Sequence, residues 1–265
     1  MCEHDSPITR RELTAYNHLA MVTMKKPGAL LVRELLDSFK AMGPAGEHQC
    51  LVHEPLGMSM ETLRQLSPGR TLPEQLLKAF LIHMLQALDF LHTDAKMVHA
   101  GKFKTSSTRL VLSPARSTKI VLTPSLVDLQ ASNVHLRIED DTILKEFEEA
   151  ELSSPITRKV DGDRVIYESR GLKLPQRHGC PVLCDFGEAR FGNKTYTDEI
   201  QPYTYRAPEI ILNIPWSYSA DIWNLGVLVS LLSANAQHES WNYSDWRSTI
   251  DLGYIREQAT VQRSG

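Results

Sequence analysis

The sequence has few cysteines, no excess of basic charge and no long apolar run, and each absence excludes a class of protein. Four cysteines in 265 residues are too few for a disulfide framework. Cys180 and Cys184 have no second pair beside them, so we expect reduced cysteines in or near a core strand rather than a zinc site. Lys and Arg number 29 against 32 Asp and Glu, and this net charge of −3 gives no reason to expect a nucleic-acid partner. Because the sequence shows neither an apolar run of about 18 residues nor a secretory leader, we expect an intracellular protein, cytoplasmic or nuclear, without a membrane partner.

Apolar residues make up 42% of the chain, which is enough for a sizeable core in one domain or two lobes. Their spacing is most regular after Thr71-Leu72-Pro73-Glu74, which has the pattern of a capping box with an early proline. The apolar stripe that follows alternates between two helical spacings and predicts a helix with one buried face: Leu77, Leu81, Met84, Leu88 and Leu91.

The other expected elements are less strongly marked. Composition and periodicity predict a helix at 9–22, strands at 30–39 and 49–53 around a turn at 43–46, an acidic helix at 138–152, a loop at 153–178, a short strand at 181–184 and a helix at 216–232. In the acidic helix, Phe147 and Leu152 are the candidate anchors to a core. The chain after Ser233 has no clear period, so we expect Trp241 and Trp246 in a partial core or an irregular tail rather than at a recognition site.

Three short motifs in the second half of the chain carry the functional information. Asp185-Phe186-Gly187 comes first, Ala207-Pro208-Glu209 follows, and Asp221-Ile222-Trp223-Asn224-Leu225-Gly226 comes last. A single D-F-G is weak evidence, because three residues recur by chance. All three motifs in this order and at these spacings are typical of the metal-binding turn, the end of the activation segment and the next buried helix of a protein kinase.

The chain resembles the protein kinases over about residues 10–229, and most closely the SR-protein kinases, notably their fungal members. Residues 46–57 resemble the strand and hinge of that family, 88–99 resemble the end of its long helix and the start of its catalytic loop, and 201–209 resemble the anchor of its activation segment. The acidic stretch at 138–152 resembles the spacer that many of these kinases carry before D-F-G. The resemblance implies an α+β, two-lobe protein-kinase-like fold, truncated at both ends. Its expected parts are an incomplete small lobe at 1–56, a mainly helical large lobe at 57–232 with an insertion at 101–127 and an acidic spacer at 138–178, and an atypical tail at 233–265.

The catalytic loop of the family, H-x-D-x-x-x-x-N, is split in this sequence. His99-Ala100 is followed by Gly101 instead of Asp, and the missing half is found at Asp128-Leu-Gln-Ala-Ser-Asn133. Removing residues 101–127 restores the motif. That segment has five basic residues and no acidic one, and its two ends can encode a splice donor and a splice acceptor. We therefore interpret it as a translated intron, and the alternative is a genuine surface insertion.

The resemblance assigns roles to individual residues of the site. It implies that Asp128 is the base that accepts the proton of the substrate hydroxyl, and that Asn133 and Asp185 hold Mg²⁺. The backbone of Glu54 and Leu56 is implied as the hinge that contacts the adenine of ATP. Asp221 resembles the buried aspartate that braces the catalytic loop, and an N-cap of the helix that follows is a compatible alternative.

Several parts of the family pattern are absent or changed. The sequence contains no G-x-G-x-x-G and no V-A-I-K. Glu12 resembles the helix glutamate that pairs with that lysine, so without the lysine we expect it to be a solvated surface residue. Gln130 replaces a lysine of the catalytic loop, His135 replaces an apolar residue beneath the adenine, and Glu209 lacks the arginine that pairs with it in the family.

The implied function is phosphorylation of serine or threonine in a protein substrate, such as a Ser/Arg-rich splicing factor, with ATP and Mg²⁺. The departures from the pattern lead us to expect weak activity or none in this chain. A non-catalytic kinase-like binding module and a mis-spliced fragment without stable function are the alternatives.

Overall fold

The computed structural model describes residues 7–22, 26–43, 46–101, 131–162, 164–172, 178–192, 194–201 and 205–233. The α-helices are α1 (Pro7–Met21), α2 (Met60–Leu66), α3 (Glu74–Asp89), α4 (Thr142–Ser153), α5 (Pro208–Ile211) and α6 (Ser219–Ser233). The strands are β1 (Asp37–Gly43), β2 (Gly46–Val52), β3 (Leu56–Ser59), β4 (Met97–Val98), β5 (Val134–Ile138), β6 (Arg158–Asp161), β7 (Arg164–Tyr167), β8 (His178–Leu183) and β9 (Arg190–Phe191). Shorter helical turns are η1 (Pro27–Leu31), η2 (Pro68–Arg70), η4 (Ala131–Asn133) and the π-helical turn η3 (Phe90–Asp94). Asp128, Gln130, nearly all of the insertion at 101–127 and the tail beyond Ser233 lie outside the described residues.

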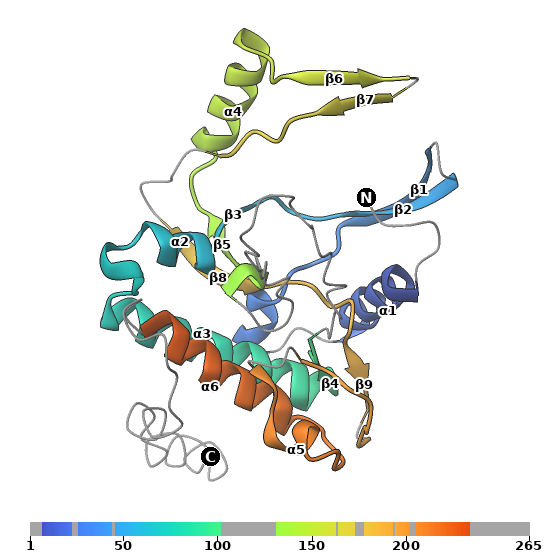
Figure 1. Ribbon diagram of the computed structural model, residues 1–265, viewed down its shortest axis with the longest axis vertical. Coiled ribbons are helices and arrows are strands. Elements are labelled where there is room, and N and C mark those ends of the chain that lie inside the picture. The colour runs from blue at the N-terminus through green and yellow to red at the C-terminus, as the bar shows by residue number, and fades with distance from the viewer. Residues whose placement is uncertain are drawn as a thin grey trace, which may run out of the picture.

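The long helix α3 is the central element of the fold (Figure 1). It packs against α6 and against strand β8 of a small antiparallel sheet with the order β3-β5-β8. The register of that sheet pairs Val134 with Leu183 and His135 with Val182. Figure 1 also shows that α4 and the β6–β7 hairpin project away from the other described elements, at the top of the view.

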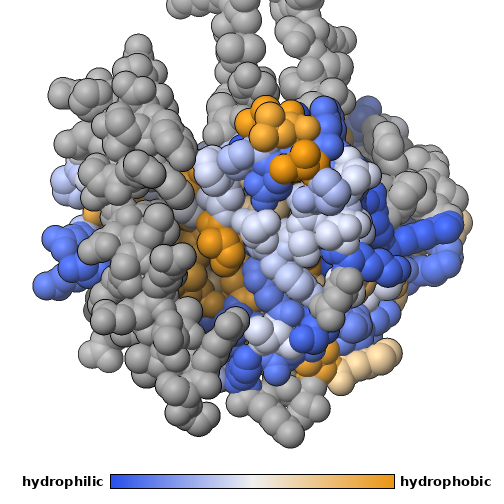
Figure 2. Space-filling view, turned by 90° about the horizontal axis from the view of Figure 1, so that it is seen from below, coloured by the Kyte–Doolittle hydropathy of each residue, from blue (hydrophilic) through white to orange (hydrophobic). Residues whose placement is uncertain are grey.

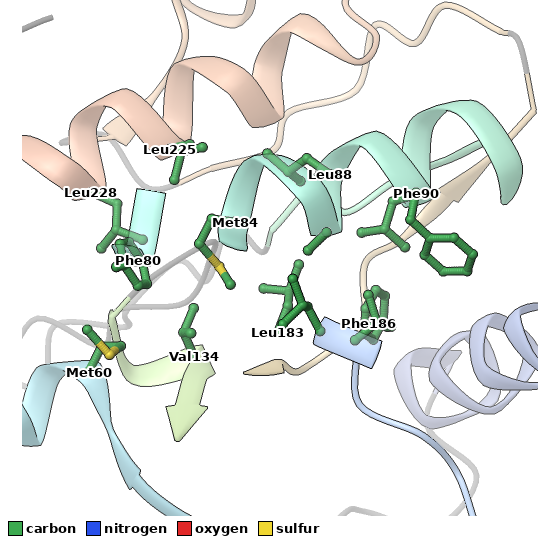
Figure 3. Packing of buried hydrophobic residues seen from close by; sticks show 14 of the residues in the cluster. Met60, Phe80, Met84, Leu88, Phe90, Val134, Leu183, Phe186, Leu225 and Leu228 are labelled. Carbon is green, nitrogen blue, oxygen red and sulfur yellow. The ribbon is translucent and has the colours of Figure 1, made fainter. Parts of the chain in front are cut away.

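The hydrophobic core is built on one face of α3, because its large apolar residues recur every four positions. Phe80, Met84 and Leu88 are each at most 2% exposed. In Figure 3, Met84 has Leu225 of α6 on one side and Val134 of β5 on the other. Full burial of one such side chain contributes roughly 1.5–3 kcal/mol. This cluster therefore fixes the positions of α6 and β5. Asp221 lies in the first turn of α6, and Asn133 directly precedes β5.

The helix predicted after Thr71 is confirmed, but the predicted capping box is wrong. The helix α3 begins at Glu74 with Pro73 as its N-cap residue, and no side chain accepts a hydrogen bond there. Thr71 stays outside the helix because the N–H of Leu72 donates to the carbonyl oxygen of Leu232 in α6, at 2.9 Å. A tertiary contact with α6 therefore takes precedence over the local capping pattern.

The strand expected at 30–39 is wrong over residues 30–36. Pro27 begins the 3₁₀ turn η1, and proline favours the first position of a helical turn. Val32 makes only an isolated parallel bridge to Leu183, so β1 begins at Asp37. The strand expected at 49–53 is confirmed within β2, and the helix expected at 9–22 corresponds to α1.

The loop expected at 153–178 contains the β6–β7 hairpin, which the sequence reading missed. Its turn includes Gly162 at φ +61°, and a Gly-Asp pair between two strands is a recognised hairpin signal. The anchor role expected for Leu152 is also wrong, because that side chain is 78% exposed, while Ile143 is the buried residue of α4. The helix expected from residue 216 begins at Ser219, since Trp216 forms a bridge with Tyr196 instead.

The described surface is mixed in character. On the face seen from below in Figure 2, most of the coloured residues are hydrophilic and apolar residues reach the surface in separate small groups. Among the helices that the structure describes, none has the length and apolar character needed to cross a membrane.

Candidate functional site

Asp221 braces the backbone at the start of the catalytic-loop motif. Its carboxylate is fully buried and accepts hydrogen bonds from the N–H of His99 (2.8 Å), the N–H of Ala100 (3.0 Å) and Nε2 of His92 (2.9 Å). The brace predicted for Asp221 is thus present. Ala100 has φ +60°, a strained conformation for a residue with a side chain, and the two hydrogen bonds hold it there.

The charge of Asp221 is stabilised by these donors. Burial opposes ionisation, but the hydrogen bond and charge of His92, the charge of His99 and the N–H of Ala100 outweigh it and hold the pKa of Asp221 below its ordinary value. The carboxylate is therefore ionised at neutral pH and stabilises the backbone turn at 99–100.

The peptide groups of Cys184 join the two halves of the split catalytic loop. The N–H of Cys184 donates to the carbonyl oxygen of Asn133 at 2.9 Å. Its carbonyl oxygen accepts a hydrogen bond from Nε2 of His99 at 3.1 Å. Asn133 follows the insertion and His99 precedes it, so both ends of the broken motif lie beside the residue that directly precedes Asp185.

The D-F-G turn has its Asp in a left-handed conformation and its Phe buried. Asp185 has φ +64°, and its Oδ1 accepts a hydrogen bond from the N–H of Gly187 at 3.2 Å. The side chain of Phe186 is fully buried and makes edge-to-face ring contacts with His99 (5.1 Å between centroids) and Tyr16 of α1 (5.4 Å). The turn is therefore fixed from the catalytic-loop side and from the α1 side.

Helix α1 brings Glu12 and Tyr16 close to the same turn and to the Cys184 thiol that precedes it. Burial raises the pKa of the Tyr16 hydroxyl far above its ordinary value, and the charge of Glu12 adds to the rise. Burial likewise raises the pKa of the Cys184 thiol to about 11, and the guanidinium of Arg33 only partly opposes this. Both groups are neutral at pH 7, so neither is a nucleophile. Glu12 was expected to be a solvated surface residue, but it is half-buried and close enough to act on both groups.

The predicted hinge leads into β3, with Glu54 just before the strand and Leu56 as its first residue. Glu54 is exposed, and its Oε2 pairs with Nη1 of Arg137 at 3.0 Å. Arg137 also donates to the carbonyl oxygen of Leu30 at 3.1 Å, so it connects the hinge to the segment before β1. Leu56 is the Cα partner of Arg137 in the sheet. The side chain of Glu54 is thus directed to Arg137 of β5. Only the backbone of this segment is then left for the predicted contact with adenine.

His135, predicted beneath the adenine, makes a backbone contact. Its Nδ1 lies 3.0 Å from the carbonyl oxygen of Gly57, and because a carbonyl can only accept, Nδ1 carries the proton. His53 at the end of β2 makes the same kind of bond with the carbonyl oxygen of Glu34, at 2.7 Å. Burial lowers the pKa of His53, so its ring is neutral at pH 7.

Gln201 organises the segment that ends in A-P-E, the predicted activation-segment anchor, through side-chain bonds that the sequence does not predict. Its buried side chain accepts from the N–H of Ala207 (2.8 Å) and donates to the carbonyl oxygen of Ala220 (3.0 Å). Arg206 donates to the carbonyl oxygen of Gln201 at 3.2 Å. Glu209, for which no arginine partner was expected, accepts a hydrogen bond from the Ser219 hydroxyl at 2.9 Å. The only available signal was the place of Gln201 at the start of the segment that resembles the activation-segment anchor.

The donor set suits a hard cation shared with a bound phosphate. Asp185 supplies a carboxylate and Asn133 an amide oxygen, and the hydrogen bond from Cys184 places the two residues next to each other. Among the described residues, His, Cys, Asp and Glu form no group of three or more that could hold a metal ion. Mg²⁺ is commonly held by one or two carboxylates plus substrate phosphates. The residues present therefore fit Mg²⁺ bound together with a nucleotide, not a metal held by protein ligands alone.

The structure brings together most of the predicted site. Asn133, Asp185 and Asp221 converge around His99 and Cys184. Glu54 and Leu56 lie at the start of the sheet that carries β5 and β8. Asp128 lies outside the described residues, so its role as the base remains a prediction.

The chain is similar in sequence to serine/threonine protein kinases. It is 35% identical over 222 residues to a serine/threonine protein kinase of Aspergillus fumigatus, a match that covers 83% of this chain and 46% of that protein. It is 29% identical over 200 residues to the serine/threonine-protein kinase SRPK of Physarum polycephalum, covering 75% and 44%. No protein-family model matches the chain. The chain thus spans about half the length of the curated relatives it matches.

The fold has a counterpart among solved structures. A crystal structure of a kinase domain superposes with a TM-score of 0.54 at 19% sequence identity, over 90% of this chain and 57% of that one. At this identity the likeness concerns the fold alone, and it agrees with the sequence similarity. The chain is a homologue of the serine/threonine protein kinases and has the protein-kinase fold.

Proposed function

We propose that the chain carries the site of an ATP-dependent protein serine/threonine kinase of the SR-protein-kinase type. The observation that supports this best is the position of Cys184, whose peptide groups bond to His99 on one side of the insertion and to Asn133 on the other. Residues that are distant in sequence are thereby gathered beside Asp185, as phosphoryl transfer requires. In that reaction catalysis is almost entirely positioning and electrostatic stabilisation.

Each residue has a defined task in the proposed reaction. Asp128 would accept the proton of the attacking hydroxyl, and Asp185 and Asn133 would hold Mg²⁺. When bound, Mg²⁺ supplies positive charge that neutralises the phosphate oxygens during transfer. Asp221 would act indirectly, because it fixes the backbone at His99 and thus the start of the loop.

The substrate that we propose is a protein segment rich in serine and arginine. Similarity to the SRPK of Physarum polycephalum supports this class. Exposed carboxylates are also present on the projecting helix α4, at Glu148 and Glu149, and they would attract an arginine-rich chain.

The activity that we propose for the 265-residue chain is weak or absent. The insertion directly adjoins the Asp that would act as base, and a misplacement of about 1 Å can cost roughly 100-fold in rate. The sequence also contains neither a G-x-G-x-x-G loop nor a V-A-I-K lysine to hold the phosphates. These same observations favour the second candidate, a kinase-like module that binds a partner without catalysis.

A thermal-shift experiment separates the candidates. The melting temperature is measured without ligand, with ATP and with ATP plus Mg²⁺, for the wild-type chain and for Asp185→Asn. A Mg²⁺-dependent rise that Asp185→Asn abolishes supports the nucleotide site. A cooperative melt without any rise supports the binding module, and a non-cooperative melt supports a mis-spliced fragment. Transfer of labelled γ-phosphate to a Ser/Arg peptide, with an Ala/Arg peptide as control, then tests the reaction itself.

A further inference from the structure

We propose that Glu188, the residue directly after the D-F-G turn, is a positioning residue that holds helix α1 against that turn. The proposal deepens the proposed function. Only its consequence for nucleotide binding rests on that function. The packing of α1 can be measured whether or not the chain binds a nucleotide.

One carboxylate oxygen of Glu188 receives guanidinium groups from two different elements. Nη1 of Arg11 in α1 lies 2.6 Å from Oε2, and Nη1 of Arg190 in β9 lies 3.3 Å from the same atom. Arg190 also donates to the carbonyl oxygen of Glu188 at 2.7 Å and pairs with Asp198 at 2.8 Å. Glu188 therefore joins α1, β9 and the activation segment at one point.

This ion-pair group is more protected from water than an ordinary surface pair. The side chains of Glu188 and Arg190 are only 13% and 16% exposed, and that of Arg11 is 39% exposed. Screening by water and salt is weaker for partly buried charges, and hydrogen bonds between charged groups are the stronger kind. The contact is therefore strong enough to influence where α1 lies.

The contact acts on the part of α1 that faces the site. Arg11 directly precedes Glu12, and Tyr16 one turn later packs against Phe186 of the D-F-G turn. The other end of the helix has its own anchor, because Nε2 of His18 donates to the carbonyl oxygen of Ala95 at 2.7 Å. Glu188 thus holds the N-terminal half of α1, which contains Glu12 and leads into Tyr16.

Neutralising Glu188 should loosen α1 and leave β9 in place. Arg190 keeps its bonds to Asp198 and to the backbone carbonyl in a Glu188→Gln variant, whereas the charged bridge from Arg11 is lost. The geometry therefore predicts an effect confined to α1 and its contact with Phe186. A merely structural role in the turn would instead affect β9 and the whole fold.

The test measures backbone amide exchange by mass spectrometry in the full 265-residue chain. The variants are Glu188→Gln, Arg11→Gln and the double variant. The control is Glu47→Gln, which breaks the exposed Lys40–Glu47 pair (2.8 Å) of the β1–β2 hairpin. We expect each single variant to speed exchange in α1 by about threefold or more, with α3 unchanged. The double variant should exchange no faster than the faster single variant, and the control should leave α1 as it is.

Two results would overturn the proposal. One is α1 exchange within about twofold of wild type in both single variants, and the other is a double variant whose effect is the product of the two single effects. Arg11 is partly exposed, so Arg11→Gln still decides the question if Glu188→Gln does not fold. Where the wild-type chain binds Mg²⁺-ATP, both variants should raise Kd by about threefold. A chain that binds no nucleotide refutes the proposed function, while the exchange data still decide the role of Glu188.

Discussion

The ring of His99 donates through Nε2 to the carbonyl oxygen of Cys184 at 3.1 Å, and these residues are 85 positions apart in the sequence. The bond fixes the catalytic-loop motif to the strand that leads into D-F-G. The same peptide segment binds Asn133 through the N–H of Cys184. The kinase arrangement is therefore kept on both sides of the insertion, although the motif is broken in the sequence.

Replacement of Asp221 should cost much of the stability of the fold. Asp221→Ala leaves the N–H groups of His99 and Ala100 without their buried acceptor, and each loss costs about 1–3 kcal/mol. We expect a decrease of about 3 kcal/mol or more in the free energy of unfolding, measured by urea denaturation. Asp221→Asn should cost less, because its amide oxygen can still accept. Asp37→Asn, an exposed control, should change the free energy by less than about 0.5 kcal/mol.

The contribution of Asp221 should disappear in acid. Its pKa in the folded chain lies below the ordinary value of 3.8, so folding favours the ionised form. Such a group contributes stability that is fully present above the unfolded pKa and is lost as the pH falls through the folded pKa. The difference in unfolding free energy between wild type and Asp221→Asn should therefore be constant above about pH 5 and shrink below it. A difference that grows as the pH falls would contradict the assignment of an ionised Asp221.

Gly28 allows η1 to lie directly on α3. A Cβ at this position would lie 1.9 Å from the carbonyl oxygen of Gln86 and 3.1 Å from Cβ of Phe90. The first contact involves backbone, which cannot move aside as a flexible side chain can. Gly28→Ala should therefore lower the free energy of unfolding by about 1–3 kcal/mol or more. Gly171→Ala is the matched control, since a Cβ there meets nothing within 4 Å, and both variants can be compared by their urea midpoints. Equal midpoints would show that η1 is not packed so closely.

The sequence located the site better than it described the contacts within it. D-F-G, A-P-E and the Asp221 motif consist of particular residue types that the chemistry of the site requires. They can therefore be recognised in the sequence itself. The brace by Asp221 followed from the same pattern and is confirmed. The long helix could be predicted from the spacing of Met84 and Leu88, because burial on one face imposes the helical period.

What could not be predicted depends on contacts between distant residues. The bonds of Cys184 to His99 and Asn133 use backbone atoms, which leave no trace in the residue type. Glu188 and Gln201 gain their roles only when separate elements meet at them. The local pattern at Thr71-Leu72-Pro73-Glu74 predicts a cap, whereas the bond of Leu72 to α6 is set by tertiary packing and has no signal in the sequence.

Deletion of residues 101–127 should increase both stability and activity. The deletion joins Ala100 directly to Asp128 and restores H-x-D-x-x-x-x-N. The loop-closure entropy of a 27-residue segment amounts to about 3 kcal/mol, so the free energy of unfolding should rise by up to that amount. Asp221 fixes the backbone of Ala100, which would directly precede Asp128, and Cys184 fixes the backbone of Asn133, five residues after it. The restored loop would therefore be held at both ends.

The rate of γ-phosphate transfer to a Ser/Arg peptide is the decisive measurement for this deletion. If the deletion returns Asp128 to within about 1 Å of the position that catalysis needs, the transfer rate should be roughly 100-fold higher than that of the full chain. The same deletion with Asp128→Asn should be as stable but should lose the gain, because the amide cannot accept the proton. A stable deletion variant whose rate does not rise would show that the insertion is not what limits catalysis. Binding of the phosphates would then be limiting, since neither of the two chains compared contains a G-x-G-x-x-G loop or a V-A-I-K lysine to hold them.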